Sequence, residues 1–255
     1  VIGHTAQETI SIDGSTDLVP EFQILGTGAA DASMMLAAFS TTATIAGSPI
    51  LGFVKSGDAA IDGTHVVVTD GEELGNIVAY GDDGTDLESI AAQIQFEVDG
   101  SPGTGDMPGR IVFATTADGS QAASEAMRID SSQNVGIGET DPDTILHIKD
   151  GAPDITLEDS DGGDVYKVGN NGGNYRIRNV TDSRTDLNIT GAGIVGIGTA
   201  SPEGGLLHVK VDDAGGTATP HTSAQLVLER NGTNYLQFLT GNDGTSGLLF
   251  GDEDD

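Results

Sequence analysis

The chain has 255 residues, enough for one large domain or a few small ones, and it carries a net charge of −30. Its 40 acidic and 10 basic residues disfavour binding to nucleic acid or to an anionic membrane, because both need a basic surface. Cysteine is absent, which excludes disulfides and thiolate metal sites. Glycine is abundant and lies mostly beside Asp, Asn and Ser, so we expect many short strands joined by tight turns.

The first predicted elements lie in the N-terminal half. The segment Ser33–Phe39 is predicted to be a strand by analogy with later segments, with a short helix over Asp31–Phe39 as the alternative. Apolar residues alternate with other residues from Ile90 to Val98, which predicts a strand. A helical face over Leu87–Ile94 is the competing pattern, but it matches a shorter stretch.

Two hairpins are predicted further along the chain. Residues Asp99–Gly109 are rich in Gly and Pro and predict an exposed loop between two strands. The strand Ile111–Phe113 leads to a turn at Asp118-Gly119. Met127 and Ile129 run to a turn over residues 131–134, after which the chain returns through Val135–Ile137.

A 16-residue cassette occurs twice. The first copy is N-V-G-I-G-E-T-D-P-D-T-I-L-H-I-K over Asn134–Lys149, and the second, one residue longer, covers Ile194–Lys210. The residues shared by the two copies are Gly136, Gly138, Pro142, His147 and Lys149 in the first and Gly196, Gly198, Pro202, His208 and Lys210 in the second. Self-similarity of this kind is the signature of a repeat architecture.

A second repeated element follows each cassette. D-I-T-L-E-D (Asp154–Asp159) and Q-L-V-L-E-R (Gln225–Arg230) are each followed by a Gly/Asn turn and a Tyr-bearing strand. The second of these turns, Asn231-Gly232, predicts a hairpin that leaves through Leu236 and Phe238.

The repeats divide the chain into an N-terminal β segment (1–32), a first fibre unit (33–150, with a large insertion at 58–125), a second unit (151–211) and the start of a third (212–255). The third unit lacks its cassette, so we expect the native polypeptide to continue past Asp255.

The cassette resembles a repeat found in many phage tail-fibre and virion-appendage proteins. Four preceding segments resemble the same family in the same order: Gly71–Ile77, Tyr80–Gly84, Pro108–Phe113 and Ala126–Asp130. The resemblance implies an elongated, interwoven β-structure, usually a homotrimer of β-prism or β-helix type. Many members end in a self-cleaving chaperone domain, and nothing in this chain resembles that domain.

A physical argument also favours association. Modest apolar content spread evenly over short repeats does not close a compact core in one chain. Stacked repeats and associated chains would supply the missing burial and cover open strand edges.

The residues that carry chemistry have ordinary structural explanations. The G-x-G fragments at Gly136 and Gly196 lack the third glycine and the helix of a dinucleotide site, so we expect tight bends there. His147 and His208 could meet their copies at a threefold axis and bind a metal, but a partly buried packing role is the favoured interpretation.

Calcium or magnesium is the other weak candidate. Asp159, Asp161 and Asp164 partly mimic a calcium loop but lack its glycine and terminal glutamate spacing, and residues 81–86 form a second acidic turn. Solvated turns are the expected role of both. We therefore expect no cofactor and no catalytic residue.

The predicted function is a non-catalytic structural fibre segment of a phage virion that supports attachment to a host cell. Its partners would be its own copies, other virion proteins and a host surface glycan or protein receptor, at loops such as Asp99–Gly109. Neither nucleic acid binding nor membrane insertion is expected. The alternatives are a cellular extracellular adhesin or surface filament, and a glycan-degrading tailspike that uses paired acids.

Overall fold

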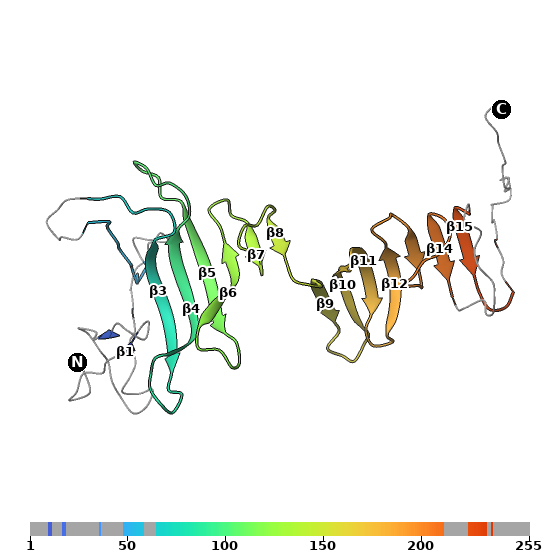
Figure 1. Cartoon of the computed structure of the whole chain (residues 1–255), viewed down its shortest axis with the longest axis horizontal. Helices are drawn as coiled ribbons and strands as arrows, with labels where there is room; N and C mark the ends of the chain where they lie inside the picture. The colour runs from blue at the N-terminus through green and yellow to red at the C-terminus, as the bar shows by residue number, and fades with distance from the viewer. Residues whose placement is uncertain are drawn as a thin grey trace. The chain divides into compact units, whose positions relative to one another are not determined.

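The computed structural model describes residues 10–11, 17–18, 36, 48–58, 65–211, 224–233 and 236. Every regular element among these residues is a β-strand, which confirms the predicted all-β class. The described part accordingly offers no helical segment that could span a membrane. The chain divides into two units, Val1–Lys149 and Asp150–Asp255, each with its own sheet (Figure 1).

The first unit is built on a six-stranded sheet whose strands lie side by side in chain order (Figure 1). These strands are β3 (Glu73–Gly81), β4 (Ser89–Val98), β5 (Gly109–Thr116), β6 (Ala123–Ile129), β7 (Val135–Ile137) and β8 (Leu146–Ile148). Neighbours from β3 to β7 are antiparallel, whereas β7 and β8 are parallel. A separate antiparallel pair joins β1 (Ile10–Ser11) and β2 (Asp17–Leu18).

The second unit contains a seven-stranded sheet, again in chain order. Its strands are β9 (Asp154–Glu158), β10 (Val165–Asn171), β11 (Asn174–Asn179), β12 (Arg184–Ile189), β13 (Val195–Ile197), β14 (Leu207–Lys210) and β15 (Leu226–Glu229). Neighbours from β9 to β13 are antiparallel, and β13, β14 and β15 are parallel.

The strands and turns predicted between residues 90 and 137 are confirmed. The alternating pattern of residues 90–98 forms β4, so the competing helical pattern is wrong. The predicted hairpin turn lies between β6 and β7, where Gln133 adopts φ +68°. The predicted loop after Asp99 joins β4 to β5, and it ends one residue early because Gly109 already pairs with Val98.

Two of the expected hairpins have different outcomes. The one that opens at Asp154 is confirmed as the antiparallel pair β9–β10. At Asn231-Gly232 the first arm is β15, while the second arm lies outside the described residues apart from Leu236. The segment Ser33–Phe39 also lies outside them, apart from Leu36.

Candidate functional site: two apolar sheet faces

One face of the first sheet is apolar across all six strands. Directly paired residues lie on the same face of a sheet, so the register aligns side chains into rows. One row consists of Ile77, Ile94, Phe113, Met127, Ile137 and Ile148, one from each strand. The next row consists of Phe96, Ile111, Ile129, Val135 and Leu146. We call these residues the first apolar face.

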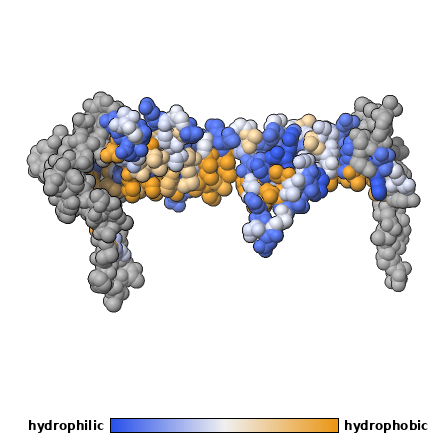
Figure 2. Space-filling model, turned by 90° about the horizontal axis from the view of Figure 1, so that it is seen from below, coloured by the Kyte–Doolittle hydropathy of each residue, from blue (hydrophilic) through white to orange (hydrophobic). Residues whose placement is uncertain are grey.

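The first apolar face is exposed on its outer strands, whereas its residues on β4, β5 and β6 are half-buried. Ile77 at one edge is 47% exposed and Leu146 at the other is 52% exposed. The described contact that covers part of it comes from Phe53, whose ring stacks on Phe96 with centroids 5.9 Å apart. Figure 2 shows hydrophobic residues gathered along one side of this unit, with hydrophilic residues along the opposite side.

The second sheet repeats this arrangement across seven strands. Its row consists of Ile155, Val168, Ile177, Leu187, Ile197, Val209 and Leu228. A neighbouring row on the same face consists of Tyr175, Ile189, Val195, Leu207 and Leu226. We call these residues the second apolar face, and Ile155 at its edge is 49% exposed.

Neither sheet has a deep core of its own among the described residues. The buried hydrophobic residues are Val68, Val98, Val112 and Ala114. Fully burying a Val, Leu, Ile, Phe or Met side chain contributes roughly 1.5–3 kcal/mol. Covering the two apolar rows of each sheet would therefore stabilise an assembly considerably. Large continuous apolar patches on a protein surface mark interaction sites.

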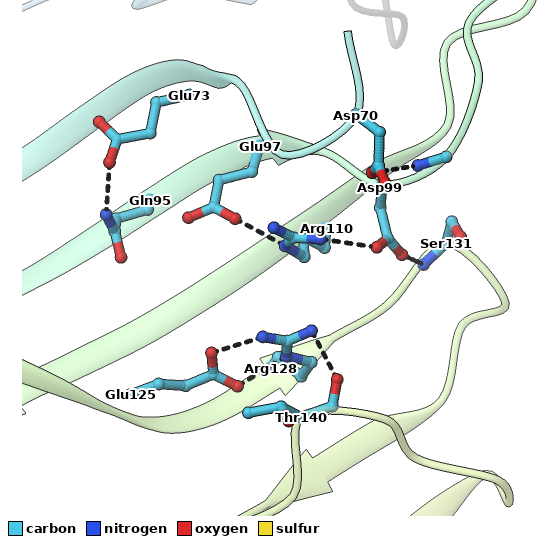
Figure 3. A network of polar contacts seen from close by, with 11 residues as sticks. Asp70, Glu73, Gln95, Glu97, Asp99, Arg110, Glu125, Arg128, Ser131 and Thr140 are labelled. Atoms are coloured by element: carbon cyan, nitrogen blue, oxygen red, sulfur yellow. Dashed lines mark hydrogen bonds and ion pairs between the residues drawn. The ribbon is translucent and has the colours of Figure 1, made fainter.

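The opposite face of the first sheet is polar and internally paired (Figure 3). Arg110 Nε donates to Glu97 Oε2 at 2.6 Å, and its Nη1 donates to Asp99 Oδ1 at 2.9 Å. The Ser131 N–H donates to Asp99 Oδ2 at 2.7 Å, which ties the β4–β5 loop to the β6–β7 turn. Partial burial raises the pKa of Asp99, but hydrogen bonds from Ser131 and Arg110 outweigh it and lower the pKa below its usual value.

A second arginine organises the same face. Arg128 holds both oxygens of Glu125, each at 2.6 Å, and its Nη1 donates to the Thr140 carbonyl at 2.6 Å (Figure 3). The bidentate hydrogen bonds with Glu125 raise the pKa of Arg128 above its usual value. The Thr140 bond fixes the loop of the first cassette against β6.

Both cassettes fold in the same way. Each contributes a pair of parallel strands, β7–β8 in one and β13–β14 in the other, in the same register. Gly138 and Gly198 follow the first strand at φ +67° and +74°. A Cβ at either position would lie 2.3 or 2.1 Å from the carbonyl oxygen of Lys149 or Lys210, so only glycine fits. The predicted tight bends are therefore present.

The two cassette histidines lie on the polar faces. His147 pairs with Gly136 and His208 with Gly196, one residue out of step with the apolar rows. His208 is 1% exposed; its Nδ1 accepts from the Glu203 N–H at 3.0 Å and its Nε2 lies 2.8 Å from Glu229 Oε2. Both ring nitrogens are engaged, which favours the packing role.

His147 has looser surroundings. Its Nδ1 lies 3.1 Å from Asp143 Oδ1, but the approach lacks hydrogen-bond geometry, and this buried atom has no hydrogen-bond partner. Its Nε2 is 4.0 Å from Glu139 Oε2. Glu139 is also 2.6 Å from Lys149 Nζ, an ion pair between loop and strand that the repeat comparison did not reveal because Thr199 stands at the equivalent position.

The acidic turns carry hydrogen bonds of their own. Asp159 Oδ1 accepts from the Asp161 N–H at 3.0 Å, and Asp164 Oδ2 accepts from Asn179 Nδ2 at 2.8 Å. Within the described ranges, no group of three or more His, Asp or Glu side chains could hold a metal ion. Within these ranges the structure does not group Asp159, Asp161 and Asp164 into such a site.

The geometry defines an all-β protein whose two large sheets each have one apolar and one polar face. No protein-family model and no curated protein matches the chain. A solved structure of the carboxy-terminal domain of the bacteriophage T5 L-shaped tail fibre is similar, with 13% identity and a TM-score of 0.34, over 65% of this chain and 92% of that one. The same domain with its intra-molecular chaperone domain is similar at 12% identity and a TM-score of 0.34, over 85% and 72%.

Proposed function

We propose that this chain is a non-catalytic structural segment of a phage tail fibre, in which three copies associate through the first and second apolar faces. The observation that carries the proposal is the unbroken apolar row across each sheet, aligned by the strand register and partly exposed to solvent. A sheet that is polar on one face and apolar on the other must bury the apolar face against another layer. Equivalent faces of further copies supply that layer.

The number of copies, three, follows from the tail-fibre resemblance of the cassette. Three sheets that turn their apolar faces toward a common axis enclose them in a prism and leave the polar faces outside. Closed symmetry is the usual arrangement of soluble homo-oligomers, and a threefold axis is one of its forms. The net charge of −30 then lies on the outer surface, where it keeps fibres apart.

The host-binding part of the proposal rests on the loop between β4 and β5. Its residues 103–107 are exposed, and Asp99 anchors its base through Arg110 and Ser131. An exposed loop on a fixed base is a common site of variable recognition. Three copies would present it three times, which raises avidity for a surface glycan or protein receptor without one strong site.

Two measurements test this function. Sedimentation equilibrium of the purified chain should give three times the 25.9 kDa chain mass. Gold-labelled antibodies against residues 65–211 should mark external fibres on purified virions. A monomer in solution would overturn the association.

The same labelling experiment separates the alternatives. Label on the surface of uninfected cells, with none on virions, would instead support a cellular adhesin. Loss of viscosity from a host polysaccharide on incubation with the protein would support a glycan-degrading tailspike.

A further inference from the structure

Two of the strands that end a sheet have no neighbour on one side among the described residues. β8 is the last strand of the first sheet and β9 is the outermost strand of the second. Their apolar residues are well exposed, with Leu146 at 52% and Leu157 at 59%. An unpaired strand edge is a template for pairing with another chain.

The second unit shows what the repeat places beside this edge. By the internal repeat, β14 corresponds to β8 and β15 corresponds to β9. β14 and β15 pair in parallel, with Leu207 opposite Leu226 and Lys210 opposite Glu229. Glu229 bridges the pair, with one oxygen 2.8 Å from His208 Nε2 and the other 3.2 Å from Lys210 Nζ.

The same register is chemically complementary when applied to β8 and β9. It sets Ile155 opposite Leu146, Leu157 opposite Ile148, Thr156 opposite His147 and Glu158 opposite Lys149. The two apolar pairs extend the apolar rows. Glu158 would then stand where Glu229 stands in the second unit, beside the Nε2 atom of the histidine and the Nζ atom of the lysine. The Lys149 ammonium, with three donors, then lies between Glu139 and Glu158.

Connection length identifies which copy supplies the strand. The parallel pairs within this chain are joined by residues 138–145, 198–206 and 211–225, whereas residues 149–153 join β8 to β9. A parallel partner in the same chain is reached by returning past the length of the strand, and the shortest such connection in this chain, residues 138–145, is longer than residues 149–153. A strand supplied by a neighbouring copy needs no such return.

We propose that β9 of one copy pairs in parallel with β8 of the next copy, in the register of β14 and β15. The inference rests on the proposed threefold association, which gives each β8 one β9 from the next copy and closes the ring. The chains are then interwoven at the junction between their two units.

Paired cysteines test the proposal in the full-length chain, which has no cysteine of its own. The variant K149C/E158C places thiols on facing positions of the proposed pair. Neighbouring strands lie about 4.8 Å apart, within the range of about 4.4–6.8 Å that a disulfide spans between Cα atoms. The matched control K210C/E229C makes the same two changes at the equivalent positions of β14 and β15, which pair within one chain.

After mild oxidation, non-reducing denaturing electrophoresis reads the outcome. We expect K149C/E158C to give covalent trimers that reduction returns to single chains, and K210C/E229C to give single chains with an internal disulfide. An internal disulfide in K149C/E158C, or none in a protein that still sediments as a trimer, would overturn the inference and leave the proposed function intact. A monomer of the unaltered chain would overturn both.

Discussion

The Nε2 atom of His208 lies 2.8 Å from Glu229 Oε2, and this contact joins β14 to β15. The ring is buried, and its Nδ1 accepts from the Glu203 N–H. Since Nδ1 accepts, a neutral ring carries its proton on Nε2 and donates it to the carboxylate. The contact therefore connects the second cassette to the strand that opens the next repeat.

Removing the carboxylate should leave a buried donor without a partner. We expect E229A to lower the free energy of unfolding by about 1–3 kcal/mol, the usual effect of an unsatisfied buried group. E229Q retains an acceptor oxygen and should lose less. Urea unfolding at a fixed chain concentration measures both variants, and equal losses would show that the hydrogen bond contributes little.

The cassette glycine Gly198 should tolerate no side chain. G198A combines a left-handed backbone, which costs roughly 1–2 kcal/mol, with a Cβ 2.1 Å from the Lys210 carbonyl oxygen. G193A is the matched control, because Gly193 has φ +82° but open space around its Cβ. Thermal unfolding should show a larger loss for G198A, and equal losses would contradict a role for the close approach.

Stability of the first cassette should fall in acid. A hydrogen bond from Lys149, assisted by the Asp141 N–H, lowers the pKa of Glu139 from 4.5 to about 2. A carboxyl whose pKa is lowered by folding stabilises the folded state above its unfolded value, and this contribution is lost as the pH falls from 4.5 toward 2.

Variants that remove this ion pair should show a weaker acid dependence. We expect the unfolding midpoints of E139Q and K149M to change less than that of the unaltered chain between pH 4.5 and 2. A parallel decline in all three proteins would rule out the ion pair as the cause.

A charged side chain introduced on β4 should prevent association only where it lies in the first apolar face. Ile94 lies in the central row, and the adjacent Gln93 points to the opposite face. We expect I94E to sediment as a monomer, because a carboxylate buried between sheets is costly, and Q93E to remain a trimer. If I94E kept the trimer mass, this face would not be the association surface.

Local patterns predicted the strands and turns well. The alternation in residues 90–98 indicated β4 because one face of that strand is apolar and the other polar. The hairpin turn after Ile129 was likewise predicted from polar residues between two alternating strands. These features depend on neighbours in sequence, so single-sequence reasoning finds them.

The internal arrangement of the cassette was not predicted. In each copy the two strands are parallel. The connections between them, residues 138–145 in the first copy and 198–206 in the second, are shorter than the usual crossover of a dozen or more residues. The ion pair between Glu139 and Lys149 was missed because it occurs in one copy of the repeat and depends on that loop's path.

The amino-acid sequence by itself determined that this protein is all-β, where its strands turn and which residues repeat, since these follow from periodicity and turn chemistry. The register of strand pairing decided which apolar side chains lie on the same face. It aligned Ile94 with Phe113 and Ile177 with Leu187, and so converted scattered apolar positions into two continuous faces. Register is a property of strand pairing, and a shift of one residue would have put every one of those side chains on the polar side.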